Sequence, residues 1–399
     1  MNKRILIILG IVVGLIIVGL ILFLVLYPGK TSQTITTVFG LFPGGGEKIT
    51  TQPGTGGQAG VPPTIQPGQE KPLIQLTQKA VSGATFASNG MVRYIEKSTG
   101  NIYDIASQGG NANRISNTTH PGIFESYWSP NGEQVVVRYV EKNESSISDV
   151  IRNFSVTSID ATSTSIKGVL LLSSIETVSS SPKENKIFYM IPLDGANVGI
   201  TASFEDKKQK QILSTPFGEW ISAWPSERVI SLLSKPSAIA EGYLYKLDPV
   251  SGAFERVLPG INGLTALWSP DANYVLYSES GYDNFRTFIY SVKDKKVSSF
   301  DVTTLPEKCV WSKINKGIVY CAVPASLPSA KYPDDWYQGL ISFNDQVWKI
   351  DILKGTTEII PFSAGMNLDI VNLFFNKNED HLLFQNKYDG TLWSLRLTE

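Results

Sequence analysis

The chain has 399 residues, of which 42% are hydrophobic, 11% aromatic and 18% charged, and 35 basic against 36 acidic residues leave a formal net charge of −1. This composition supplies enough apolar material for a large packed core, and the aromatic content favours strands. No run of basic residues is longer than the pair Lys207–Lys208. Because the chain lacks the basic stripe that neutralises phosphates, we expect no nucleic-acid partner.

The chain contains two cysteines, Cys309 and Cys321, and two histidines, His120 and His381. Two cysteines are too few for a disulfide-framed scaffold or a four-cysteine zinc site, and two imidazoles argue against a histidine-based metal centre. We therefore expect no metal and no small-molecule cofactor.

Residues 5–27 form an apolar run without a charge or a proline. As a helix the run would span roughly 34 Å, which matches a bilayer core and exceeds the apolar region of a cleaved signal peptide. Lys3 and Arg4 precede the run, whereas only Lys30 follows it directly. The charge bias predicts a single-pass anchor with residues 1–4 in the cytoplasm and the rest of the chain outside. A buried core helix is the alternative.

Residues 28–72 are rich in Gly, Pro, Thr and Gln and have almost no apolar periodicity. Such a segment cannot bury enough apolar surface to offset the entropy lost on ordering, so we expect a disordered linker. As a Gly-rich coil it would have an end-to-end distance on the order of 35 Å, which would hold the following domain clear of the lipid headgroups.

Residues 73–399 contain a repeated phrase. Trp128-Ser129-Pro130-Asn131-Gly132 precedes a strand-like run, and Trp268-Ser269-Pro270-Asp271-Ala272 does so again. Weaker copies bring the number to seven, with markers at Ser88, Ser129, Ser181, Pro225, Ser269, Ser312 and Asn376. Most intervals are close to the period of about 40 to 45 residues that is typical of four-stranded propeller blades, and longer intervals indicate loop insertions.

The phrase itself predicts a hairpin, because proline presets φ and Gly or Asn accepts a positive φ. Its Trp is suited to packing between neighbouring blades. Tyr243–Asp248 and Asp345–Asp351 lead through glycine turns to further strands, and we expect them to be third strands of their blades. The last such strand, Thr391–Leu397, has no fourth strand after it, whereas Pro72–Thr77 is a lone strand before the first copy.

Pairing these two terminal strands would complete the seventh blade and remove the open edges of the ring. The sequence therefore predicts an all-β, seven-bladed β-propeller closed by its N- and C-terminal strands. A β-sandwich or two smaller barrels are the alternatives. The repeated phrase, together with Leu-Tyr-x-x-Asp-x-x-Ser-Gly at Leu244–Gly252, resembles the TolB-type propeller repeats, distant relatives of WD-repeat blades in bacterial envelope proteins. The resemblance covers most of residues 73–399 and implies a fold, not a function.

The candidate binding residues lie in an insertion of the sixth blade, between Tyr320 and Gln346. They combine aromatic anchors with paired carboxylates on one loop, a composition typical of binding hot spots: Tyr332, Asp334, Asp335, Trp336 and Tyr337. The alternative is that this loop folds back and its aromatic residues are packing. Cys309 and Cys321 bracket a predicted hairpin and would face each other in register, as a disulfide or as two free thiols.

No catalytic signature is present: the chain lacks G-x-S-x-G, H-E-x-x-H, a P-loop and a strand-following G-x-G-x-x-G. We assign no catalytic residue, and the sequence favours a non-enzymatic, membrane-tethered module that binds a protein, peptide or envelope polymer. The alternative is an extracytoplasmic hydrolase or lyase that uses carboxylates in the central funnel of the propeller.

Overall fold

The structure is a computed structural model that describes residues 72–117, 119–142, 150–160, 162 and 164–398. The predicted anchor, residues 5–27, and all of the predicted linker except Pro72 lie outside these ranges. Within them, no helix has the length and apolar character needed to cross a bilayer.

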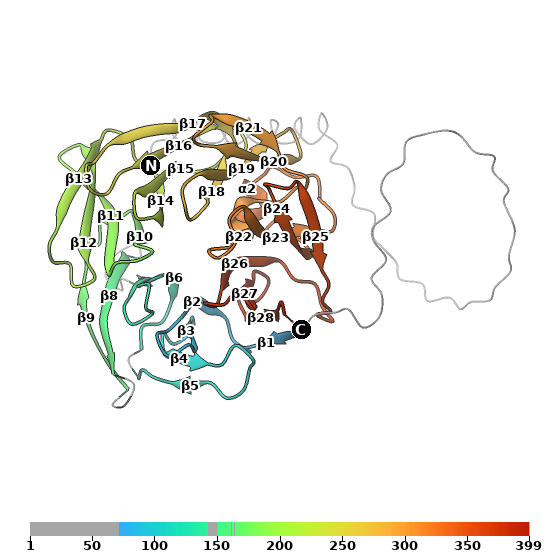
Figure 1. Ribbon diagram of the computed structural model, residues 1–399. Coiled ribbons are helices and arrows are strands. Elements are labelled where there is room, and N and C mark those ends of the chain that lie inside the picture. The colour runs from blue at the N-terminus through green and yellow to red at the C-terminus, as the bar shows by residue number, and fades with distance from the viewer. Residues whose placement is uncertain (1–71, 118, 143–149, 161, 163, 399) are drawn as a thin grey trace, which may run out of the picture. The chain divides into compact units, whose positions relative to one another are not determined.

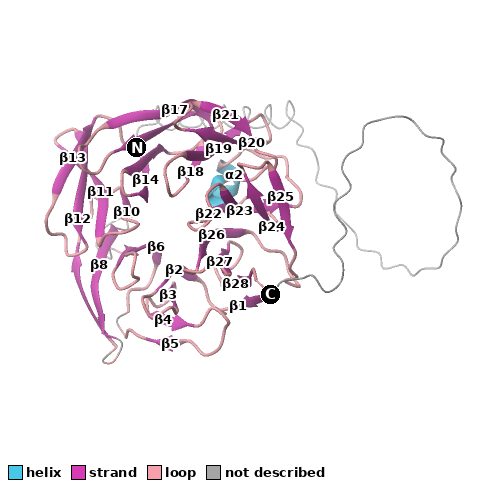
Figure 2. Cartoon of the chain, in the orientation of Figure 1, coloured by secondary structure: helices cyan, strands magenta, loops and turns pink. Residues whose placement is uncertain are grey.

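The described residues fold into seven four-stranded antiparallel sheets arranged as a ring (Figures 1 and 2). Each sheet is one blade, and its first strand lies nearest the axis. Blades one to three contain β2 (Val81–Phe86), β3 (Val92–Glu96), β4 (Ile102–Ile105) and β5 (Asn113–Arg114); β6 (Ile123–Trp128), β7 (Val135–Glu141), β8 (Val150–Asp160) and β9 (Ser165–Leu170); and β10 (Thr177–Ser180), β11 (Lys186–Leu193), β12 (Ala196–Ser203) and β13 (Lys210–Thr215).

Blades four to six contain β14 (Trp220–Ser226), β15 (Val229–Ser234), β16 (Glu241–Leu247) and β17 (Phe254–Asn262); β18 (Thr265–Trp268), β19 (Tyr274–Ser280), β20 (Phe285–Ser291) and β21 (Lys296–Ser299); and β22 (Cys309–Trp311), β23 (Ile318–Pro324), β24 (Asp345–Asp351) and β25 (Thr356–Ile360). A 3-10 turn, η1 (Pro306–Lys308), precedes β22, and the short helix α2 (Asp334–Tyr337) lies between β23 and β24.

The seventh blade is built from both ends of the described chain. Its strands are β26 (Ile370–Phe375), β27 (His381–Asn386), β28 (Leu392–Arg396) and, as the outermost, β1 (Leu73–Gln75). Leu73 pairs with Leu395 and Gln75 with Trp393. The predicted seven blades and the predicted closure by terminal strands are therefore confirmed, and the sandwich and two-barrel alternatives are excluded.

The repeated phrase forms the hairpin between the first two strands of a blade. In blade two, the Ser129 hydroxyl donates to Asn131 Oδ1 (2.7 Å) and accepts from the Gln134 amide (2.9 Å). Ser269 makes the same two contacts in blade five, with Asp271 and Tyr274. The serine is thus a hydrogen-bonded tie across the turn, a role that the sequence pattern alone did not reveal.

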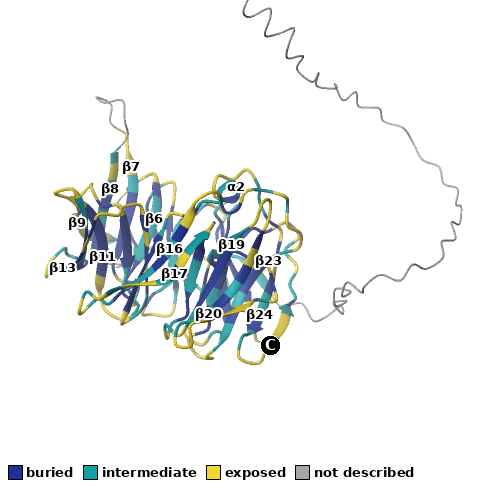
Figure 3. Cartoon of the chain, turned by 90° about the horizontal axis from the view of Figure 1, so that it is seen from above, coloured by how far each residue is buried: buried dark blue, intermediate teal, exposed yellow. Residues whose placement is uncertain are grey.

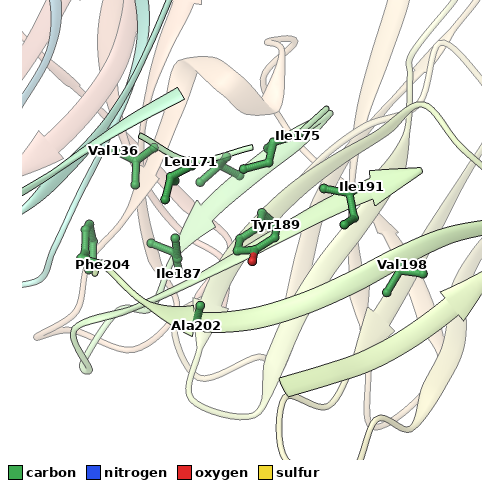
Figure 4. Close-up of a cluster of buried hydrophobic side chains, with 10 residues drawn as sticks. Val136, Leu171, Ile175, Ile187, Tyr189, Ile191, Val198, Ala202 and Phe204 are labelled. Atoms are coloured by element: carbon green, nitrogen blue, oxygen red, sulfur yellow. The ribbon is translucent and has the colours of Figure 1, made fainter. Parts of the chain in front are cut away.

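The core is divided into clusters that lie between neighbouring blades. Trp128, which is 8% exposed, packs with Ile95 and Ile102 of the preceding blade, as the phrase predicted. The next cluster joins Val136 of blade two to Ile187, Tyr189 and other residues of blade three (Figure 4). The inner strands thus bury both faces: β3, β15 and β27 are buried almost throughout, whereas the outermost strands β5 and β21 are exposed.

Antiparallel strand order gives the ring two distinct faces. The connectors between second and third strands, and those from a fourth strand to the next blade, emerge on one face, which we call the upper face. The connectors between first and second and between third and fourth strands emerge on the lower face. α2 lies on the upper face, and the C-terminal end lies on the lower face (Figure 3).

Candidate functional site

Exposed apolar side chains are concentrated on the connectors of the upper face. On the lower-face connectors the large exposed apolar residues are Val250, Ile314 and Leu353. The upper-face connectors carry a longer series, distributed over blades two to seven: Leu172, Phe217, Ile239, Tyr282, Leu327, Tyr337, Leu340, Met366 and Tyr388. Because more exposed apolar residues lie on the upper-face connectors than on the lower-face connectors, we take the upper face as the candidate functional surface.

The insertion of blade six, residues 325–344, joins three upper-face connectors into one surface. The Ala238 amide of the blade-four connector donates to Asp334 Oδ2 at 2.6 Å. The blade-five connector is bonded through Asp283, whose carboxylate accepts from the Ser329 hydroxyl (3.1 Å) and whose backbone carbonyl accepts from the Ala330 amide (3.2 Å). These contacts hold neighbouring connectors in one arrangement.

Four exposed residues beside these hydrogen bonds form what we call the insertion patch. They are Ile239 at 86% exposure, Tyr282 at 97%, Tyr337 at 42% and Leu340 at 70%. Ile239 and Tyr282 are sequence neighbours of Ala238 and Asp283, which the insertion binds. The patch therefore extends over blades four, five and six on a hydrogen-bonded framework.

The five residues predicted as a binding group have different surroundings. Tyr332 and Trp336 are 1% and 3% exposed and pack in a cluster with Phe285, Leu305 and Phe343. The Tyr332 ring centroid lies 4.7 Å from that of Phe285. These two aromatic side chains anchor the insertion to the propeller, as the folded-back alternative anticipated.

The remaining three predicted residues lie at or near the surface. Asp334 and Asp335 are half-buried, and the Asp335 carboxylate accepts from the Lys331 amide at 2.8 Å, which fixes the start of α2. Tyr337 is 42% exposed as a residue, and its hydroxyl donates to the Glu307 carboxylate, where burial raises the pKa of both groups. Of these five residues in one loop, Tyr337 is thus the only one that is more exposed than half-buried Asp334 and Asp335.

A buried ion cluster beneath the insertion was not predicted. The Lys308 ammonium is fully buried and lies 2.8 Å from Asp345 Oδ2 and 2.5 Å from Asp369 Oδ1. It also lies 5.1 Å from the ring centroids of Trp336 and Phe343. One lysine thereby links η1, blade six, the approach to blade seven and the insertion.

The hydrogen bonds of Asp369 complete this link. Its Oδ2 accepts from the Trp336 indole N–H (2.9 Å) and from the Phe343 amide (3.1 Å). Asp345 is also desolvated, and this burial raises its pKa to about 6 although Lys308 opposes the shift. Nothing in the spacing of residues 308, 345 and 369 signals the cluster, because it forms only when blades six and seven meet.

Cys309 and Cys321 lie directly opposite each other on β22 and β23. Their sulfur atoms are 2.13 Å apart, joined as a disulfide, and the two residues are 5% and 0% exposed. The bond crosses the blade-six hairpin immediately after Lys308. It therefore reinforces the part of the blade that carries the insertion.

A cavity of about 420 Å³ lies between the axial strands of blades seven, one and two. Its walls come from β26, β2 and β6, and Glu125 is the one Asp or Glu among the described residues that line it. Arg138 Nη1 donates to Glu125 Oε2 at 2.7 Å. Glycoside cleavage by carboxylates needs two such groups that face one cleft, and this cavity presents one.

No protein-family model matches the chain, and no curated protein matches it. Among solved structures, the chain is similar to an oligogalacturonate lyase from Vibrio parahaemolyticus, with a TM-score of 0.55 and 11% identity over 84% of this chain and 96% of that one. The β-propeller domain of the Trilobed protease from Pyrococcus furiosus gives a TM-score of 0.50 and 13% identity, over 80% of this chain and 95% of that one.

TolB from Acinetobacter baumannii is also similar, with a TM-score of 0.41 and 11% identity over 75% of this chain and 60% of that one. At such identities the likeness concerns the fold alone. An oligogalacturonate lyase in complex with manganese is a further match at TM-score 0.55. Among the described residues of this chain, no group of three or more His, Cys, Asp or Glu side chains is placed to hold a metal ion, so we derive no manganese chemistry for it.

Proposed function

We propose that this chain is a non-enzymatic binding or scaffold module, tethered to a membrane by residues 5–27 and carrying its propeller on the extracytoplasmic side. Its partner is a protein, a peptide or an envelope polymer, bound through the upper face. The N-terminal residues 1–4 lie in the cytoplasm. Residues 28–72 act as the spacer between membrane and propeller.

The observation that carries the proposal is the insertion patch. Three of its residues, Ile239, Tyr282 and Leu340, are at least 70% exposed although their connectors are hydrogen-bonded to one another. A surface already fixed before binding loses little conformational entropy when a partner covers it, and aromatic groups at its centre supply binding energy. The closed ring and the buried Lys308 cluster provide the rigid support.

The test compares charge insertions on the two faces in the full-length chain. The triple variant Ile239→Glu, Tyr282→Glu and Leu340→Glu places charges in the insertion patch. The matched control, Val250→Glu, Ile314→Glu and Leu353→Glu, changes exposed apolar residues on lower-face connectors. Removing the whole insertion would be a poorer test, because Tyr332 and Trp336 would leave the core.

Partners are captured by crosslinking in native membranes and identified by mass spectrometry, with purified envelope polymers tested in parallel. We expect one partner to be retained by wild type and by the lower-face variant and lost from the upper-face variant. Equal capture by all three chains would contradict binding through this face. No bound protein or polymer, together with cleavage of a polymer, would favour the hydrolase or lyase alternative.

A further inference from the structure

The axial cavity has a hydrogen-bonding character that binding at the upper face does not explain. Its polar lining consists of Ser82, Glu125, Ser126, Tyr127, Asn372 and Gln385. Apolar walls come from Ala84, Phe124, Leu373 and Phe374. A site with a few fixed polar groups in an otherwise apolar wall is the usual design for a small ligand or a single side chain.

Glu125 is held so that one carboxylate oxygen remains free. Its Oε2 accepts from Arg138 Nη1 (2.7 Å) and from the Tyr127 hydroxyl (2.9 Å). Its Oε1 accepts no hydrogen bond from the described residues, and 41% of the side chain is exposed. Burial and the neighbouring Glu125 charge raise the pKa of Tyr127 above its usual value, so the hydroxyl stays protonated and keeps donating.

Arg138 fixes the position of Glu125 and uses three of its five N–H donors inside the protein. Its Nε donates to Asn153 Oδ1 at 3.0 Å and its Nη2 to the Ile175 carbonyl at 3.1 Å. The residue is 6% exposed. A ligand in the cavity would therefore meet the carboxylate and not the guanidinium.

Asn372 presents a second free acceptor from the opposite wall. It lies at a bulge in β26 and adopts a φ of 52°, in the left-handed region that favours glycine. Its side-chain amide N–H donates to Gln385 Oε1, and Gln385 Nε2 donates to the Val81 carbonyl at 2.9 Å. This chain of bonds uses one N–H of each side-chain amide and leaves Asn372 Oδ1 without a donor among the described residues.

Ser126 follows the same pattern, since its hydroxyl donates to the Ser82 carbonyl at 3.3 Å. The Tyr127 and Ser126 hydroxyls and one N–H of each of Asn372 and Gln385 are thus bonded within the protein, and the buried Ser82 hydroxyl has no partner among the described residues. Glu125 Oε1 and Asn372 Oδ1 remain as free acceptors, and Glu125 is the charged one. An alkylammonium group carries three donors, a positive charge and no acceptor. We propose that the axial cavity binds a primary ammonium group, with its alkyl stem against Phe124 and Leu373.

This site goes beyond the binding function proposed for the upper face and does not depend on it. The same ammonium chemistry occurs at a lysine side chain and at a peptide N-terminus. The insertion patch and the cavity are built from different blades, so each can fail its test while the other passes.

The experiment is isothermal titration calorimetry on the full-length chain in detergent. The probes are Nα-acetyl-lysine methylamide, its Nε-acetylated neutral form, and trialanine amide with a free N-terminus. Glu125→Gln removes the charge at nearly constant shape, and Glu141→Gln removes the charge of an exposed residue on β7 as the matched control. Asn372→Gly removes the second acceptor, and glycine adopts the local φ without strain.

We expect an amine probe to bind wild type and the Glu141 variant equally. Both Glu125→Gln and Asn372→Gly should weaken that binding about tenfold, the value of one charge-assisted hydrogen bond. Whichever charged probe binds more tightly identifies the source, lysine side chain or N-terminus. The proposal would be overturned if the neutral probe bound as tightly as the amine, or if both variants kept the wild-type affinity. It would also be overturned if no amine bound at millimolar concentration, or if Ca²⁺ bound and excluded the amine. If Glu125→Gln does not fold, Asn372→Gly decides.

Discussion

Replacing Lys308 by methionine should destabilise the propeller more than any surface change in blade six. The ammonium is fully buried between Asp345 and Asp369, so Lys308→Met leaves two carboxylates in the core without their counter-ion. Removing one partner of a buried ion pair typically costs about 3–5 kcal/mol. This is a large part of the about 5–15 kcal/mol that holds a native protein together.

The assay is urea unfolding of the full-length chain at pH 7, followed by tryptophan fluorescence. Lys349→Met is the matched control, because Lys349 is 40% exposed and its ammonium lies 3.8 Å from the Glu358 carboxylate. Such surface pairs contribute about 0–1 kcal/mol. The double variant Lys308→Met, Asp345→Asn removes one orphaned carboxylate and should recover part of the loss. If the free energy of unfolding of Lys308→Met lies within about 1 kcal/mol of the wild-type value, the cluster does not hold the insertion as described.

Three further predictions follow from the same structure. The disulfide closes a short loop with a sequence separation of 12, so the double variant Cys309→Ala, Cys321→Ala should lower the free energy of unfolding by about 3 kcal/mol. The reduced wild-type chain should unfold with the same free energy as this variant. A double variant as stable as the oxidised wild type would contradict the bond. Burial raises the pKa of Asp345 to about 6 in the folded chain, above an unfolded value of about 3.9, so the folded chain holds a proton that the unfolded chain releases. The free energy of unfolding should therefore fall as pH rises from about 4 to about 6, by up to about 3 kcal/mol from this group. Asp345→Asn should flatten that part of the profile of urea midpoint against pH. Identical profiles for the variant and the wild type would refute this prediction. Replacing Leu73–Gln75 by three glycines should expose the edge of β28, which speeds hydrogen exchange at Leu392–Arg396 and promotes aggregation on size-exclusion chromatography; unchanged exchange would show that β1 does not close the ring.

The sequence was most informative where local chemistry repeats. A turn-forming phrase that returns seven times predicts seven hairpins, and Trp128 was correctly expected between blades because a large apolar side chain before such a turn has no other place to be buried. The closure of blade seven was predictable because one strand was missing at one end and one was spare at the other. The register of Cys309 opposite Cys321 followed from the same hairpin.

The candidate site was harder to predict, because its contacts join residues from different blades. Composition marked the insertion correctly as a loop with aromatic and acidic residues, but it could not separate the buried Tyr332 and Trp336 from the exposed Tyr337. Lys308 gave no signal, since an isolated lysine in a sequence is normally a surface residue. Ile239 and Tyr282 were missed for a related reason: each is a single apolar residue in its own connector, and only the ring places them beside the insertion.

The most direct test of binding through the upper face is site-specific photocrosslinking in native membranes. A photoreactive amino acid replaces Tyr282 on the upper face in one chain and Val250 on the lower face in another, two positions of high exposure. We predict a discrete crosslinked partner from position 282 and none from position 250. The same partner crosslinked from position 250, with none from position 282, would contradict it.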